Sequence, residues 1–246
     1  MSNHIKKIEN LAKNKAKTYK TFKDINFLLA KFKYHAKNFE KFYSDFIQTH
    51  KEIGKQNAIN LIRQAEKLTH AQPGTLNRAK RKIDVNVNSQ IIHPLFFELD
   101  IIMIDARRIA EFFIKFIADL SDEKPPKKIH SFFTSLSNKP SEQNKFIKKL
   151  NELDVKYIKF LKKSWDDWIS ELSDYRSKSI HKSIERMIKC TVTVRWNEGS
   201  PIEKPNEIKI NNLEFHEKNV INYVNNLWKN LSRFIREGSQ FIINNF

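Results

Sequence analysis

The sequence predicts an all-α protein: an up-and-down bundle of four to five long helices with one inserted β-hairpin at about residues 190–213. Apolar residues recur at three- and four-residue steps over most of the chain, which is the period of an α-helix. Only one stretch alternates apolar and polar residues as a strand does. The 246 residues include only 4 Gly, too few for the many tight turns of a large sheet.

The chain is predicted to form one domain with a short appendage. Residues 1–24 are polar and rich in Lys, and we expect a basic N-terminal arm or a frayed helix there. Residues 25–246 are predicted to form the helical bundle domain, with the hairpin inside it. Hydrophobic residues make up 40% of the chain, which is enough for a core of this size.

The first helical region begins at about residue 25, with Phe32, Phe39 and Phe46 at helical steps. The pattern continues beyond Gly54, so the region forms one long helix or two helices joined near Gly54. Residues 72–93 contain turn-forming residues and break the period, which predicts a surface loop. This loop holds a basic cluster made of Arg78, Lys80, Arg81 and Lys82.

The second helical region, residues 95–120, is apolar except for one narrow polar stripe. The stripe consists of Arg108, Glu111, Lys115 and Asp119. So wide an apolar face predicts a central bundle helix or a helix at an oligomer interface. The charged residues exclude a membrane span. Residues 121–141 contain three Pro and are predicted to be a loop.

The third helical region follows a predicted helix start at Ser141-Glu142-Gln143-Asn144, where an acidic residue comes close behind a Ser, and it runs to about residue 172. Trp165 and Trp168 lie three residues apart on one face, and we interpret them as core anchors. The hairpin follows, with Val192 and Val194 alternating with polar residues. A last helix is predicted from about residue 215 to residue 246.

The sequence lacks the motifs of several common catalytic and ligand-binding sites. Neither a phosphate-binding glycine loop nor a G-x-S-x-G motif is present, and no two of the eight His have the spacing of a helical metal site. Cys190 precedes an apolar strand and is predicted to be a buried side chain, not a nucleophile. Asp166 and Asp167 are adjacent on a helix and point about 100° apart, so they form no carboxylate pair. We therefore expect no cofactor and no metal.

The charge balance points to a polyanionic partner. The chain has 45 Lys and Arg against 28 Asp and Glu, a net charge of +17. Such a surface attracts phosphate polyanions, so nucleic acid is the first partner class and an anionic membrane the second. The alternative to a polyanionic partner is that the Lys residues only keep the protein surface soluble. We expect no signal peptide and no membrane segment, and hence a cytoplasmic protein.

The segment from residue 174 to residue 183 gathers groups suited to phosphodiester chemistry. Arg176 can clamp a phosphate and stabilise developing charge, and His181 can exchange a proton near neutral pH. Ser177, Lys178 and Lys182 add hydrogen-bonding and positive groups for substrate binding. The alternative interpretation is that residues 174–183 have no catalytic or binding role and form an exposed basic turn at a helix junction.

The spacing Arg176-x4-His181 resembles the Arg-x4-6-His signature of HEPN domains, with Ser177 where the commonest form has Asn. HEPN domains are all-α bundles, and many are metal-independent ribonucleases of toxin–antitoxin and phage-defence systems. The resemblance implies catalysis by Arg176 and His181, RNA as substrate and 2′,3′-cyclic phosphate ends. It also implies a homodimer with a composite active site and an antitoxin or regulatory protein as a possible partner. Arg63 and His70, with six residues between them, match the Arg-x4-6-His signature by chance, in the first helical region.

Two other functions remain open on the sequence. A non-catalytic HEPN-type module would bind RNA or nucleotide through the same basic residues. A helical interaction protein would instead dock a partner on the apolar face of residues 95–120. RNA cleavage distinguishes the enzyme from both, and salt-sensitive RNA binding distinguishes the module from the interaction protein.

Overall fold

The computed structural model describes residues 2–68, 81–87, 94–124, 127–136, 138, 143–179, 188–215 and 218–246. Within these ranges the side chains of residues 2–5, 176–179, 188–189, 212, 214–215 and 218 are not described. The described part is mostly helical with a small antiparallel sheet, which confirms the predicted helix-rich class. It divides into two compact units. Unit 1 comprises Met1–Ala36, Leu99–His181 and Val224–Phe246, and unit 2 comprises Lys37–Glu98 and Lys182–Tyr223.

The helices and strands follow one another in this order: α1 (Ser2–Lys13), α2 (Ala16–Leu68), β1 (Arg81–Asn86), α3 (Pro94–Leu120), α4 (Ile129–Leu136), α5 (Lys145–Leu153), α6 (Val155–Ser164), the π-helical turn η3 (Trp165–Ile169), α7 (Ser170–Ser179), β2 (Ile188–Trp196), β3 (Glu207–Phe215), β4 (Lys218–Asn219) and α8 (Val220–Asn245). None of the described helices is long and apolar enough to cross a bilayer. The predicted boundary at residue 24 stays a prediction, although Thr21 and Phe22 are buried in unit 1.

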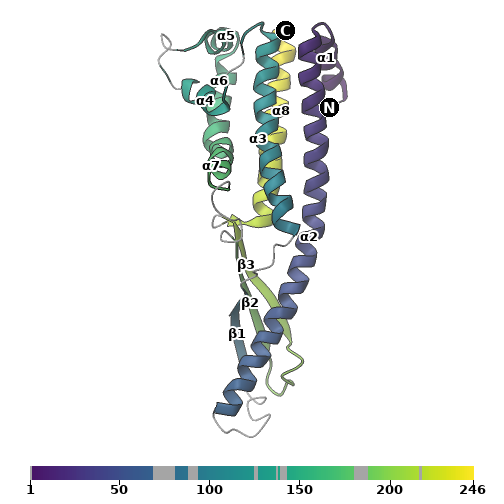
Figure 1. Ribbon diagram of the computed structural model, residues 1–246, viewed down its shortest axis with the longest axis vertical. Helices are drawn as coiled ribbons and strands as arrows, with labels where there is room; N and C mark the ends of the chain where they lie inside the picture. Colours follow the sequence, from purple (N-terminus) through teal and green to yellow (C-terminus); the bar gives the residue numbers. More distant parts are fainter. Residues whose placement is uncertain are drawn as a thin grey trace. The chain divides into compact units, whose positions relative to one another are not determined.

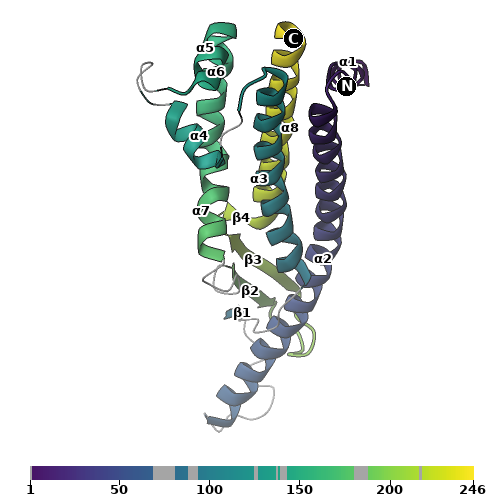
Figure 2. The same ribbon diagram turned by 45° about the horizontal axis from the view of Figure 1, so that its top comes forward.

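Unit 1 is built around α3, which runs beside α8 and the first part of α2 (Figure 1, Figure 2). Aromatic rings join these helices. Phe113 of α3 meets Phe234 of α8 with ring centroids 5.9 Å apart, and Phe22 of α2 lies 6.0 Å from Phe116. Most α3 side chains from Leu99 onward are buried within unit 1. Of the two roles predicted for this helix, the central one is therefore observed.

Two carboxylates of α3 are buried against α2 in unit 1. Asp105 is fully buried, and the Lys31 ammonium lies 3.2 Å from its Oδ1. Asp119 accepts a hydrogen bond of 3.2 Å from the Thr21 hydroxyl, and Lys17 lies 2.6 Å from it. Buried carboxylates need such partners because burial removes their hydration. These pairs fix the register between the two helices.

Unit 2 contains the sheet, whose strand order is β1-β2-β3-β4 with every pair antiparallel. Val192 and Val194 of β2 lie on its apolar face, and Thr193 points to the opposite, polar face. The α2 backbone approaches the apolar face closely at Gly54: a Cβ atom there would lie 2.6 Å from the Val192 Cβ. The helix is continuous through Gly54, so one of the two predicted alternatives is observed.

A bulge keeps the apolar face of the sheet continuous. Thr191 pairs with Asn212 and Val192 with Ile210, which leaves Asn211 as the extra residue of β3. If β3 paired with β2 without a bulge, Leu213 would be opposite Lys189 and would point to the polar face. Leu213 is instead opposite Cys190 and buried.

Two predicted loops contain regular structure. Within predicted loop 72–93, residues 81–86 form strand β1, where Ile83 and Val85 pair with Val194 and Val192. Arg81 and Lys82 of the basic cluster are therefore strand residues, whereas Arg78 and Lys80 lie outside the described residues. Within predicted loop 121–141, α4 buries four apolar side chains at helical spacing: Ile129, Phe132, Phe133 and Leu136.

The boundaries of other predicted elements also change. The third helical region is interrupted at Asp154, whose carboxylate accepts hydrogen bonds from the backbone N–H groups of residues 156 and 157 and so caps α6. The α5 helix begins after Asn144, which caps it in the same way. The hairpin extends to Ile188–Phe215, and β1 and β4 join it in a sheet, so a lone hairpin was too small a prediction. The last helix begins at Val220.

Candidate functional site

The predicted site begins on α7, a helix of unit 1. Arg176, Ser177 and Lys178 are part of this helix, but only their backbone is described. His181 and Lys182 lie outside the described residues. Residue 176 comes one helical turn after Leu172, so the two positions share one face of α7. The surroundings of that face are described through Leu172 and Tyr175.

Tyr175, which immediately precedes Arg176, is held in the interior of unit 1. Its side chain is buried, and the Asp100 carboxylate of α3 is close enough to influence its hydroxyl electrostatically. Burial raises the pKa of Tyr175 above its ordinary value, and the nearby Asp100 charge raises it further. Burial also raises the pKa of Asp100, and the nearby Tyr175 hydroxyl partly offsets this rise. The buried Tyr175 side chain thus anchors the end of α7 in the interior of unit 1.

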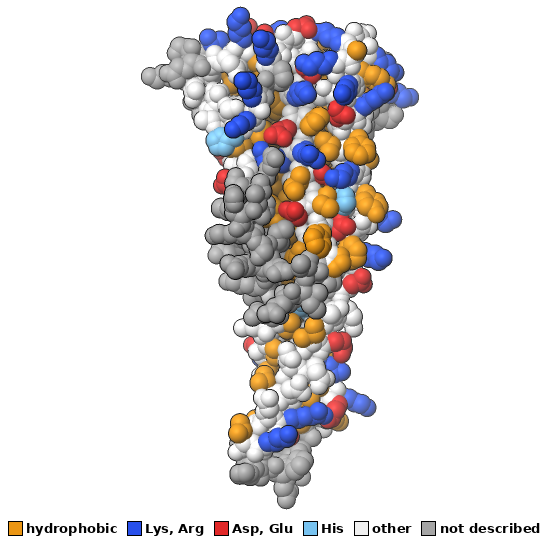
Figure 3. Space-filling view, in the orientation of Figure 1, with side chains coloured by type: hydrophobic (Ala, Val, Ile, Leu, Met, Phe, Trp, Pro, Cys, Tyr) orange, Lys and Arg blue, Asp and Glu red, His pale blue; other side chains and the backbone are white. Residues whose placement is uncertain are grey.

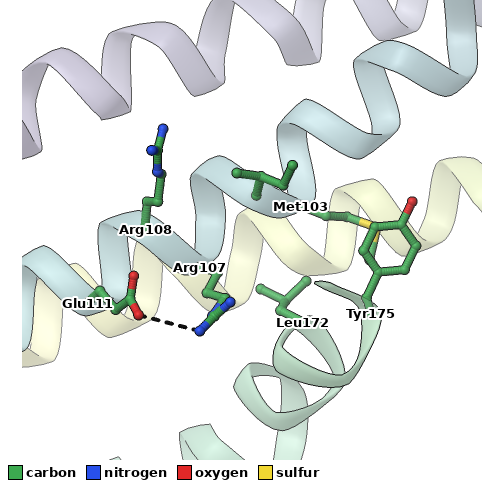
Figure 4. Close-up of a pocket in the computed structure, with 7 residues that line it drawn as sticks. Met103, Arg107, Arg108, Glu111, Leu172 and Tyr175 are labelled. Carbon is green, nitrogen blue, oxygen red and sulfur yellow. Dashed lines mark hydrogen bonds and ion pairs between the residues drawn. The ribbon is translucent and has the colours of Figure 1, made fainter. Parts of the chain in front are cut away.

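A pocket of about 210 Å³ lies between α3 and α7 beside this anchor (Figure 4). It is lined by Met103, Ile104, Arg107, Arg108, Glu111, Leu172 and Tyr175. Arg107 pairs with Glu111 at 3.4 Å, and both belong to α3. In Figure 4 the Arg107 side chain lies between the two helices, whereas Arg108 points away from α7.

The charges of this pocket suit a phosphate or another small anion. A guanidinium presents several N–H donors in a planar fork, which matches the oxygens of a phosphate. Arg107 is largely buried, with a side chain 14% exposed, so a bound anion there would be partly shielded from water. Glu111 holds the Arg107 guanidinium in place and also opposes anion entry, so an anion has to displace part of that ion pair.

Sequence reasoning missed the role of Arg107. The polar stripe of α3 was visible, and it included Arg108 and Glu111 of this pocket. Its partner helix was not predictable from the stripe, because α7 begins at Ser170, 50 residues after α3 ends at Leu120. An Arg-Arg pair on an otherwise apolar helix was the signal available.

Other candidate residues behave as structural groups. Cys190 is buried in unit 2, and burial raises its pKa to about 11, which disfavours the nucleophilic thiolate. Trp168 is buried and meets Phe234 edge to face, which confirms its core role. Trp165 is half-buried and stacks on Phe133 at 4.9 Å. Asp166 and Asp167 are both exposed.

The chance match of Arg63 and His70 to the Arg-x4-6-His signature is described by the structure only at Arg63. Arg63 forms an exposed ion pair of 3.0 Å with Glu203 within unit 2, and His70 lies outside the described residues. In the part of the chain that the structure describes, no three His, Cys, Asp or Glu side chains come together as metal ligands.

The comparisons with known proteins give no relative. No protein-family model matches this chain, and neither a curated protein nor a solved structure is similar to it.

Proposed function

We propose that the protein is a metal-independent endoribonuclease whose helical unit is an up-and-down bundle of HEPN type. The observation that carries the proposal is the position of Arg176. It directly follows Tyr175, and it comes one turn after Leu172, two residues that line a pocket containing Arg107. A phosphate bound near that pocket would lie close to α7, on which Arg176 begins the Arg176-x4-His181 spacing.

The proposed reaction is transesterification within RNA. His181 takes the proton of a 2′-hydroxyl, the 2′-oxygen attacks phosphorus, and the bond from phosphorus to the 5′-oxygen breaks. The products are a 2′,3′-cyclic phosphate end and a 5′-hydroxyl end, and the latter receives a proton. Arg176 binds the phosphate and stabilises its developing charge, while Ser177, Lys178 and Lys182 hold the neighbouring RNA backbone.

A homodimer would complete this site. Residues five apart on a continuous α-helix diverge by about 140°, so Arg176 and His181 of one straight helix would not meet on one phosphate. Two copies of the segment facing each other would supply both groups. We further propose that the enzyme acts in the cytoplasm and that an antitoxin or regulatory protein restrains it.

The charge distribution supports a polyanionic substrate. Unit 1, which carries α7, has 28 Lys and Arg against 16 Asp and Glu, so it holds most of the positive excess. Figure 3 shows Lys and Arg side chains gathered at the end of unit 1 that carries α5. Six lysines of α5 and α6 form no ion pair among the described residues: Lys145, Lys148, Lys156, Lys159, Lys162 and Lys163. Such a surface concentrates RNA at low ionic strength.

RNA cleavage in excess EDTA tests the proposal. We expect the wild type to cut RNA and leave cyclic phosphate ends, and Arg176→Ala and His181→Ala each to lose at least about a hundredfold in rate. Arg63→Ala is the matched control, because it removes the Arg of the chance Arg-x-His match and only an exposed ion pair. Equal cleavage by all four proteins, or none by the wild type, would refute catalysis by these residues.

A non-catalytic RNA- or nucleotide-binding module is the second candidate. The Arg107–Glu111 pair favours it, since this pocket offers an anion-binding guanidinium and no histidine among its described lining residues. Salt-sensitive RNA binding that survives His181→Ala, without cleavage by the wild type, would support the module.

A further inference from the structure

Two aromatic side chains of α2 in unit 1 are exposed to solvent. Phe27 is 69% exposed and Tyr34 is 63% exposed, whereas Phe32 of the same helix is fully buried. Phe27 and Tyr34 are seven residues apart, which places them on one face about 10.5 Å apart along the axis. Their face is opposite to the buried face of Ile25 and Phe32, so packing within unit 1 does not explain them.

Cations accompany these rings on the same face. Lys20 and Lys23 precede Phe27 by seven and four residues, and Lys31 lies between the two rings. We call the five residues Lys20, Lys23, Phe27, Lys31 and Tyr34 the α2 stripe. Lys31 is engaged by Asp105, whereas Lys20 and Lys23 form no ion pair among the described residues. Figure 3 shows hydrophobic, basic and acidic side chains interspersed on the visible face of unit 1.

This composition argues for nucleic acid and against a protein partner. Lys is depleted from the cores of protein interfaces, because its ammonium loses hydration there. Single-stranded nucleic acid instead binds where aromatic rings stack on bases beside cations that neutralise phosphates. Phe97 of unit 2 provides the contrast: it is 56% exposed, but Glu98, the next residue, carries a negative charge that repels phosphate.

We propose that the α2 stripe binds single-stranded RNA. Bases stack on the rings of Phe27 and Tyr34, and the backbone phosphates pair with Lys20 and Lys23. The inference rests on the proposed function only in taking RNA as the ligand, because the stripe contains none of the proposed catalytic residues. The stripe holds the RNA strand, whereas the α7 segment acts on it.

Binding is measured by the fluorescence anisotropy of a labelled oligouridine in EDTA, with His181→Ala as the parent protein so that the RNA stays intact. Loss of one stacked base costs roughly five- to 150-fold in affinity. We therefore expect Phe27→Ala and Tyr34→Ala each to weaken binding at least about fivefold. Tyr34→Phe keeps the ring and should bind as the parent does. Phe97→Ala is the matched control and should also bind normally.

Salt dependence tests the cations separately. Each phosphate contact on a single strand adds about 0.7 to the slope of log affinity against log salt concentration. The double variant Lys20→Gln, Lys23→Gln should therefore reduce that slope by about 1.4. Circular dichroism checks that all variants keep the helix content of the parent, as expected for exposed positions.

Two outcomes would overturn the inference: no RNA binding by the parent, or unchanged binding by Phe27→Ala and Tyr34→Ala. If binding is unchanged and the molecular mass of these variants changes, the stripe is a contact between copies of the chain. Failure is distinguishable from failure of the proposed function. If the wild type cleaves RNA and substitutions in the α2 stripe leave RNA binding unchanged, only the inference about the stripe is refuted. If those substitutions weaken RNA binding and the wild type cleaves no RNA, only the proposed enzymatic activity is refuted.

Discussion

Replacing Gly54 with Ala tests the contact between α2 and the sheet in unit 2. A Cβ atom at this position would lie 2.6 Å from both Cβ and Cγ1 of Val192 and 2.9 Å from its Cγ2. These distances are about 1 Å shorter than favourable carbon contacts. The Val192 Cβ is fixed by its strand and is fully buried, so the strain cannot be relieved by rotating a flexible side chain.

Two opposing terms decide the result. Overpacking of a core costs about 1–3 kcal/mol, and three simultaneous overlaps favour the upper end. Ala is a better helix former than Gly by about 1 kcal/mol. We expect Gly54→Ala to lower the free energy of unfolding by about 2 kcal/mol, as the difference of these terms. Urea unfolding followed by circular dichroism measures it.

Asn57→Ala is the control, because Asn57 is an exposed residue of the same helix. It should raise the free energy of unfolding by about 0.5 kcal/mol through helix propensity alone. If Gly54→Ala is also stabilising, the close approach of α2 to Val192 is wrong.

Three further predictions follow from buried groups. A pKa of about 11 for Cys190, against an ordinary 9.0, lowers its thiolate fraction about a hundredfold near pH 8, so the native protein should react with a disulfide reagent at least about a hundredfold more slowly than the unfolded chain; equal rates would contradict its burial. Burial raises the pKa of Asp100 in the folded protein, so the folded state favours the neutral carboxylic acid. As the pH rises through the raised pKa, the carboxyl ionises in its buried position and the folded protein loses stability. Asp100→Asn should therefore stabilise the protein at pH 7 and give no difference below about pH 4, and a gain that persists in acid would exclude this cause. Lys31→Met leaves the buried Asp105 carboxylate without its cation and should cost about 3 kcal/mol in urea unfolding, whereas the exposed Lys23→Met should change stability by less than about 0.5 kcal/mol.

The long helices were predictable because their signal is local. Ile25, Phe32, Phe39 and Phe46 recur every seven residues, so one face of α2 is apolar whatever its partner. Only the contact with Val192 explains why a Gly stands inside α2 at position 54, since a larger residue would clash with the sheet. The buried state of Cys190 was also predictable from the apolar strand that follows it.

Strand β1 was missed because its signal is short and its partner is distant. Only Ile83 and Val85 supply the apolar half of its alternation, and basic residues precede them. Its pairing joins Asp84 to Thr193, which lies 109 residues later in the chain. Helix α4 was missed for a related reason, since eight residues between Pro-containing segments give few helical turns.

One part of the candidate site could also be predicted from the sequence, and another part depends on the tertiary structure. The Arg176-x4-His181 spacing is a property of consecutive residues, and it stays a prediction for function. The pocket beside it depends on α3 and α7 meeting, and Arg107 is a pocket residue only because Leu172 and Tyr175 of α7 face it.

By itself, the sequence determined the helical periods, the apolar face of α3, the positive charge and the burial of Cys190. These properties depend on residue type and on spacing within a few turns. The tertiary structure alone decided the pairing of β1 with β2, the bulge at Asn211, the approach of Gly54 to Val192 and the pocket beside α7. Each of these requires segments far apart in the chain to meet, and which segments meet is decided by the packing of the whole core.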